Sequence, residues 1–98
     1  MLESGNMYPN QLRVLRKQHL LSQKQLATLV GQADRTMISK YEAGVAIPPT
    51  AIALKLQIIF QNDVSAIFDE YYRQLEIEVV RTRMEQAQQV PLPINFIK

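Results

Sequence analysis

Four polar side chains between Asp34 and Gly44 have types and spacings that would let them bind one ligand together. If this segment is helical, the spacing brings all four to the same face of the helix. An arginine on that face could bond two acceptors on the edge of a guanine base, and a lysine could neutralise a phosphate. An ordinary solvated helix face would have the same composition, so that alternative stays open. The four residues are Arg35, Thr36, Ser39 and Lys40.

Further basic side chains lie upstream of this segment and make the front half of the chain positive. Residues 1–60 hold seven cations and three anions, a net charge of +4, whereas residues 61–98 hold four cations and six anions, a net charge of −2. A basic front half favours a polyanionic ligand, and an acidic rear half favours a contact with protein. The general candidates for binding phosphate are Arg13, Arg16, Lys17 and Lys24.

The composition argues against several classes of protein. The chain has no cysteine, which excludes a disulfide scaffold and a thiolate metal site. Its one histidine, His19, leaves almost nothing for a zinc site or a histidine-based catalytic pair. No phosphate-binding loop or nucleophile–base pair is present either. We therefore expect no enzymatic activity, no catalytic residue, no metal and no cofactor.

The sequence also carries no signal for a membrane. No apolar run approaches the roughly 18 residues of a membrane span. The first residues lack the basic region and apolar stretch of a signal peptide. We expect no membrane association and a cytoplasmic location.

Local sequence signals predict where two short helices begin and end. The second of them carries the four polar residues. Ser22 and Gln25 fit a capping box at the start of the first of them, and Gly31 is suited to end it. Asp34 is a favourable N-cap for the next helix, which Gly44 would end. The apolar positions are Leu26, Ala27, Leu29 and Val30 in the first helix, and Ile38 and Tyr41 in the second.

Apolar residues at helical spacing predict three more helices. One follows Pro9. Another restarts the chain at Pro48-Pro49 and runs to about Phe60, and its broad apolar surface predicts a central position in the core. A short one follows Asp63, a plausible cap. The apolar residues are Leu12 and Leu15, then Leu54, Leu56, Ile58 and Ile59, then Val64, Ile67 and Phe68.

Five short helices with a tight turn between the second and the third form a helix-turn-helix arrangement. Residues 10–68 resemble the Xre-like and phage-repressor-type DNA-binding domains. The joint occurrence of LSQ..LA and ISKYEAG at this separation is a strong signal, whereas either fragment alone would be weak. The stretches that carry the resemblance are Leu12–Arg16, Leu21–Ala27, Ile38–Gly44, Pro48 and Val64–Phe68.

The resemblance implies an all-α, five-helix, repressor-like domain that binds double-stranded DNA. Its third helix would enter the major groove, where Arg35, Thr36, Ser39 and Lys40 would contact base edges. A flanking phosphate is the open alternative for Ser39 and Lys40. The resemblance also implies that Gln23, at the start of the second helix, contacts a phosphate.

Three departures from the family pattern concern the ends of helices. Two residues, Gln32 and Ala33, separate Gly31 from the next N-cap, where family members usually have one. Val45-Ala46 follows Gly44, where a basic residue is often found. Gln61-Asn62 replaces the glycine that commonly ends the fourth helix, and Asn62 could adopt the left-handed conformation instead.

The chain beyond residue 68 carries more apolar surface than a five-helix domain needs. We expect a flexible N-terminal segment over residues 1–8, a DNA-binding domain over 9–68, and an extra C-terminal helix with an extended tail over 69–98. The helix, to about Gln89, has two apolar stripes: Tyr72, Leu75 and Val79 with Tyr71 alongside, and Ile77, Val80 and Met84.

The last nine residues alternate apolar side chains around two prolines, which predicts an extended arm or an added edge strand. A disordered end is an equally open reading. We expect the segment over 69–98 to form a homodimer contact. The expected interface residues are Tyr72, Leu75, Val79, Leu92, Ile94 and Phe96.

The function expected from these observations is a sequence-specific DNA-binding transcriptional regulator, a repressor that acts as a homodimer. The alternative is an antitoxin-like or other partner-binding regulator, whose C-terminal segment binds a protein client. Nothing in the sequence supports an enzyme.

Overall fold

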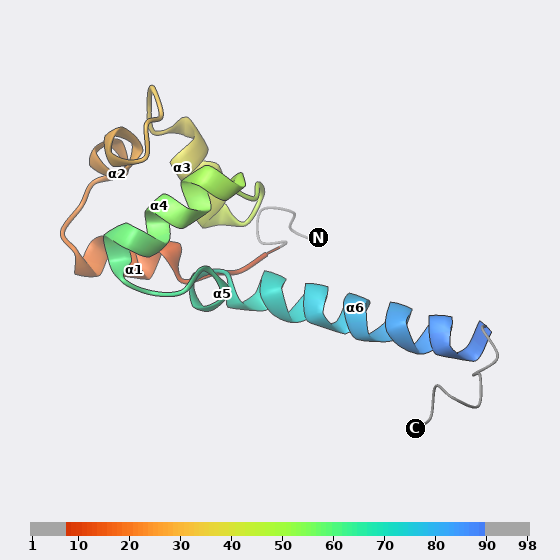
Figure 1. The fold of residues 1–98 in the computed structure, drawn as a ribbon. Coiled ribbons are helices and arrows are strands. Elements are labelled where there is room, and N and C mark those ends of the chain that lie inside the picture. Colours follow the sequence, from red (N-terminus) through yellow and green to blue (C-terminus); the bar gives the residue numbers. More distant parts are fainter. Residues whose placement is uncertain (1–7, 90–98) are drawn as a thin grey trace, which may run out of the picture.

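The computed structural model describes residues 8–89, and within that range it contains six helices and no strand (Figure 1). This confirms the all-α class and the additional C-terminal helix. The expected flexible segment over residues 1–8 falls outside the described residues except for Tyr8, and the expected extended arm over 90–98, with Leu92, Ile94 and Phe96, falls outside them entirely. The helices are α1 (Leu12–Gln18), α2 (Gln23–Leu29), α3 (Thr36–Ala43), α4 (Thr50–Phe60), α5 (Val64–Ile67) and α6 (Asp69–Gln89).

The start of α2 and the ends of α2 and α3 follow the predicted local signals. The capping box is present: the Ser22 hydroxyl accepts the N–H of Gln25 at 2.9 Å, and the Gln25 side chain accepts the N–H of Ser22 at 2.8 Å. Gly31 (φ 82°) and Gly44 (φ 77°) both take the left-handed conformation. A Cβ at Gly44 would also lie 2.6 Å from the carbonyl oxygen of Tyr8, so this position requires glycine for two reasons.

The helix α3 begins later than the sequence predicted. Its first residue is Thr36, and Arg35 rather than Asp34 stands at the N-cap position. Asp34 still supports the helix start, because its carboxylate accepts the N–H of Thr36 at 2.8 Å. That backbone hydrogen bond, followed by one from the Thr36 hydroxyl, lowers the pKa of the Asp34 carboxyl.

The turn between α4 and α5 also differs from the expectation. Gln61, not Asn62, takes the left-handed conformation (φ 52°). Asn62 instead donates its side-chain amide to the carbonyl of Phe60 at 3.0 Å. The side chain of Asp63 makes no capping bond to α5, and Gln57 accepts the N–H of Val64 at 2.9 Å in its place.

The five helices α1 to α5 together form the core, and α4 contributes only one of its faces to it. Leu54 and Ile58, expected in the core, are exposed, Ile58 by 73%, so α4 is not buried on all sides. Its buried face consists of Ile52, Ala53, Leu56 and Phe60. The rest of the core consists of Leu12, Leu26, Ala27, Val30, Ile38, Tyr41, Ile67 and Phe68.

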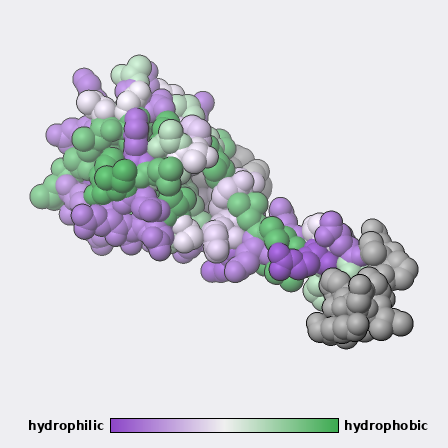
Figure 2. All heavy atoms as spheres, viewed as in Figure 1, coloured by the Kyte–Doolittle hydropathy of each residue, from purple (hydrophilic) through white to green (hydrophobic). Residues whose placement is uncertain are grey.

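The 21-residue helix α6 starts directly after the core and extends away from the other helices (Figure 1). Its first turn belongs to the domain, since Tyr71 packs against the core and its ring centroid lies 4.6 Å from that of Tyr8. Residues 72–88 are all exposed, and hydrophobic side chains alternate with hydrophilic ones along the projecting helix (Figure 2). The first turn of α6 therefore packs on the core, and the later turns project from it.

Candidate nucleic-acid interface

A concave surface between α1, α2 and α3 collects most of the residues expected to bind DNA. We call it the basic hollow. Six of the expected contact residues line it. Thr36 and Lys40 of α3 and Lys17 of α1 lie outside the hollow and are exposed. The lining consists of Arg13, Arg16, Ser22, Gln23, Lys24, Arg35, Ser39, Glu42 and Ala43.

Arg16 does not take the place expected of a phosphate ligand. It is a buried residue, and its guanidinium forms a two-pronged ion pair with Glu42, whose side chain is 5% exposed. A third bond, of 2.8 Å, runs from Arg16 to the carbonyl of Leu21. These partners take three of the five N–H donors of Arg16 and hold α1 against the end of α3, so we leave Arg16 out of the proposed DNA contacts.

A hydrogen-bond network continues from this ion pair to the beginning of α3. The side-chain amide of Gln23 donates to Glu42 at 3.0 Å. The guanidinium of Arg35 donates to the amide oxygen of Gln23 at 2.8 Å. The network therefore sets the starts of α2 and α3 relative to each other, and it holds Arg35 with most of its donors still available.

The charge that the hollow presents to solvent is positive. Its lining contains one carboxylate, Glu42, and Arg16 neutralises it. Arg13, Lys24 and Arg35 are all exposed and supply the remaining charge. A concave surface with one sign of charge concentrates its field, which favours a polyanion.

The four polar residues of α3 point away from the core, as their spacing predicted. Ile38 and Tyr41 of the same helix are buried, whereas Arg35, Thr36 and Lys40 are exposed and Ser39 is half-buried. Burial raises the pKa of the Tyr41 phenol. The exposed face of α3 thus combines hydrogen-bonding groups with positive charge.

Between residues 8 and 89, no three potential metal-binding side chains come together. In the same range, no helix combines the length and the apolar character needed to cross a membrane.

A family model described as Helix-turn-helix matches residues 12–66. The match covers more than half of the 98 residues and includes α1 to α4 and most of α5. No curated protein and no solved structure matches the chain.

Proposed function

Because this chain belongs to the helix-turn-helix family of the Xre and phage-repressor type, we propose that it binds operator DNA sequence-specifically as a homodimer and represses transcription. Membership of the family makes it a DNA-binding transcriptional regulator. The selectivity, the two-fold symmetry and the direction of regulation are our proposals. The observation that carries the DNA-binding mode is the basic hollow, which joins the starts of α2 and α3 in one positively charged surface.

Base recognition belongs to the exposed face of α3. Arg35 stands at the N-cap of that helix, and its planar donors match O6 and N7 of guanine. Thr36 offers a hydroxyl and a methyl group, and Ser39 and Lys40 lie one turn further along. Gln23 orients Arg35 through its side-chain oxygen, which reduces the freedom that Arg35 would lose on binding.

Phosphate binding belongs to the edges of the hollow. The first turn of α2 has backbone N–H groups without partners inside the helix, and Gln23 and Lys24 stand in that turn. Arg13 faces the same hollow from α1. Lys17 and Lys40 are exposed nearby on α1 and α3 and suit flanking phosphates.

The small size of the domain supports the proposed homodimer, and the homodimer supports the proposed repression. One helix-turn-helix domain reads only a short half-site, so useful affinity requires two copies on one operator. A bound dimer can block a promoter by occupying it, which requires no further surface.

The salt dependence of duplex binding tests this mode. We expect the logarithm of the binding constant to fall steeply and linearly with the logarithm of salt concentration, because phosphate contacts release counterions. Lys24→Ala should reduce that slope by about one, whereas Arg73→Ala, on α6, should leave it unchanged. An affinity that barely responds to salt would contradict the proposal.

A second candidate is an antitoxin-like or other partner-binding regulator, and the exposed apolar residues of α6 favour it. In that case α6 would bind a different protein, and the isolated chain would be a monomer. Sedimentation at tens of micromolar separates the two candidates, since the homodimer predicts twice the mass of 11.3 kDa.

A further inference from the structure

The helix α6 lacks the support that a helix of its composition needs. Every residue from 72 to 88 is exposed, and although Tyr72 and Leu75 line a groove of the domain, the turns beyond them project from it with little packing. Four of those residues are β-branched, which lowers helix propensity: Ile77, Val79, Val80 and Thr82. Most helical stability in proteins comes from the packing of an apolar face rather than from intrinsic propensity. We therefore expect α6 to pack against another protein surface.

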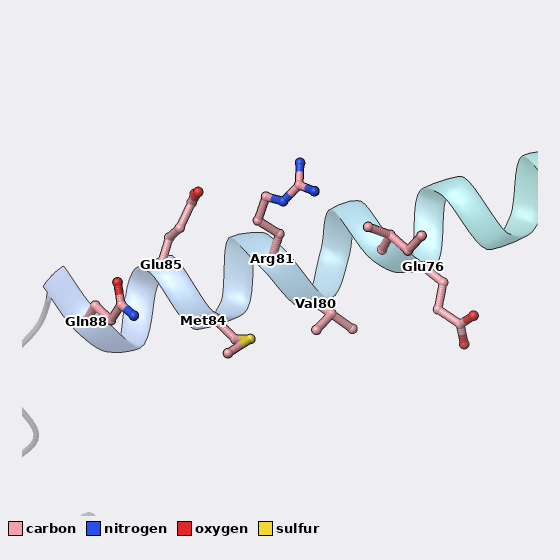
Figure 3. A pocket seen from close by; sticks show the side chains of 7 residues that line it. Glu76, Val80, Arg81, Met84, Glu85 and Gln88 are labelled. Atoms are coloured by element: carbon pink, nitrogen blue, oxygen red, sulfur yellow. The ribbon is translucent and has the colours of Figure 1, made fainter.

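One stripe of α6 has the spacing of a helix-pairing seam. Ile77, Val80, Met84 and Ala87 are separated by three, four and three residues, the a and d positions of two heptads. All four are exposed. Val80 and Met84 project to the same side of the helix in Figure 3, and Arg81 and Glu85 project to the other. Ile77, Val80 and Met84 line an open, shallow surface of α6 that no other helix of the domain covers.

The charges beside the stripe are complementary to a second copy of the same helix. Glu76 precedes Ile77 on one edge (position g), and Arg81 follows Val80 on the other (position e). In a parallel pair, a g residue meets the e residue five positions later on the partner. Glu76 of each copy would therefore face Arg81 of the other, which gives two opposite-charge pairs by symmetry.

We propose that α6 pairs with α6 of a second copy as a parallel, in-register coiled coil through Ile77, Val80, Met84 and Ala87. This deepens the homodimer of the proposed function and rests on it. An antiparallel pair with all four residues in contact would set Val80 against Met84. It would then bring the two Arg81 side chains together across the symmetry axis, where like charges repel.

This seam differs from the stripe that the sequence analysis expected to form the dimer contact. Tyr72 and Leu75 lie near the base of α6, where they line an apolar groove of the domain together with Pro48 and Phe68. Val79 continues their stripe on a different side of α6 from the seam. The interface assigned here therefore uses neither Tyr72 nor Leu75.

A parallel pair also places the two domains where DNA binding needs them. Both domains lie at the same end of the coiled coil, on either side of its two-fold axis. The helices α2 and α3 lie at the end of each domain away from the start of α6 (Figure 1). The parallel pairing would therefore bring α2 and α3 of both copies, with their basic hollows, to the same end of the dimer.

Single cysteines in the full chain test the register, because the natural sequence contains none. Ala87→Cys places the two thiols opposite each other in the parallel pair, within the reach of a disulfide. We expect mild oxidation to convert this variant into covalent dimers. The matched control is Thr82→Cys, on the opposite side of α6, which should remain uncrosslinked under the same conditions.

Charge variants test the pairing of the edges. Glu76→Lys and Arg81→Glu each turn two attractive pairs into two repulsive ones, and each should raise the dimer dissociation constant about tenfold. An equimolar mixture of the two variants restores both pairs, so it should dimerise like the wild type.

Sedimentation of the wild type and a duplex-binding assay complete the experiment. If Ala87→Cys crosslinks no better than Thr82→Cys in a dimeric chain, or if the mixture fails to recover, the parallel seam is wrong. A monomeric wild type at tens of micromolar overturns both the seam and the homodimer, while DNA binding by that monomer would leave the DNA-binding part of the proposed function standing. A crosslinked parallel dimer that binds no duplex would overturn the proposed function and leave the seam intact.

Discussion

Arg13 and Arg16 lie on the same helix and carry the same charge, yet their surroundings give them different roles. Arg13 is exposed and faces the basic hollow. Arg16 is buried, and Glu42 together with the carbonyl of Leu21 takes up its donors. A charge of this kind contributes to the stability of the domain and to the position of α3, but it supplies little to a phosphate.

Arg16→Met should destabilise the domain by about 3–5 kcal/mol, because it leaves the carboxylate of Glu42 buried without its partner. Urea unfolding at neutral pH measures the loss. The matched control is Arg73→Met, which breaks the exposed ion pair with Glu70 and should cost less than about 1 kcal/mol. Equal losses in the two variants would show that the Arg16–Glu42 pair does not stabilise the fold.

Arg35→Ala should reduce affinity for the best DNA site by about 1–3 kcal/mol and relax the preference at one base position. The reason is the loss of a two-pronged contact to guanine. Binding to the best duplex and to its single-base variants measures both effects. Lys17→Ala serves as the control, since loss of a phosphate contact weakens binding equally for all sequences. The same uniform loss in Arg35→Ala would assign Arg35 to a phosphate.

At the scale of the elements, the two glycines that end α2 and α3 have similar backbone angles and different surroundings. Gly31 has only the flexible end of Lys55 near its missing Cβ, at 3.4 Å. Gly44 has the backbone of Tyr8 there, at 2.6 Å. The end of α3 is therefore fixed by the segment that precedes α1, and a side chain at Gly44 would push that segment away.

Gly31→Ala should cost about 1–2 kcal/mol, the penalty of a left-handed conformation for a residue with a Cβ. Gly44→Ala should cost more, because the added methyl group also clashes with Tyr8. Thermal or urea unfolding of the two variants gives the difference directly. If Gly44→Ala is no more destabilised than Gly31→Ala, the close approach of Tyr8 does not contribute to stability.

The features that depend on neighbouring residues were predictable from the sequence, and those that depend on distant ones were not. The capping box of Ser22 and Gln25 and the left-handed glycines involve residues within one turn of each other. The ion pair of Arg16 and Glu42 joins residues 26 positions apart, and no local sequence pattern predicts it.

The start of α3 and the exposed face of α4 also could not be predicted from neighbouring residues alone. The first depends on which carbonyl accepts the first helical bond: the N–H of Ser39 donates to Arg35, so the helix begins at Thr36. The second depends on which side of an apolar helix the other helices cover, and periodicity alone cannot decide that. The polar face of α3, by contrast, followed from helical geometry and is exposed as expected.

At the scale of the whole molecule, the long helix α6 projects from a small basic domain. The sequence predicted the surplus of apolar residues over 69–89, but spacing alone left two stripes open. We propose the second stripe, because Tyr72 and Leu75 line a groove of the domain while Ile77, Val80 and Met84 line an open surface of α6. The domain would read one half-site, and the proposed coiled coil would fix the distance between two.

The central claim, sequence-specific binding of duplex DNA by a homodimer, is tested most directly by selecting bound duplexes from a random library with the full chain. We predict enrichment of a two-fold symmetric motif whose half-sites are centred about one helical turn apart, roughly 34–36 Å. A symmetric motif would establish selectivity and the dimer together. Selection that enriches no motif, under salt conditions where the protein binds DNA, would contradict sequence-specific recognition, and a single motif without symmetry would contradict the homodimer.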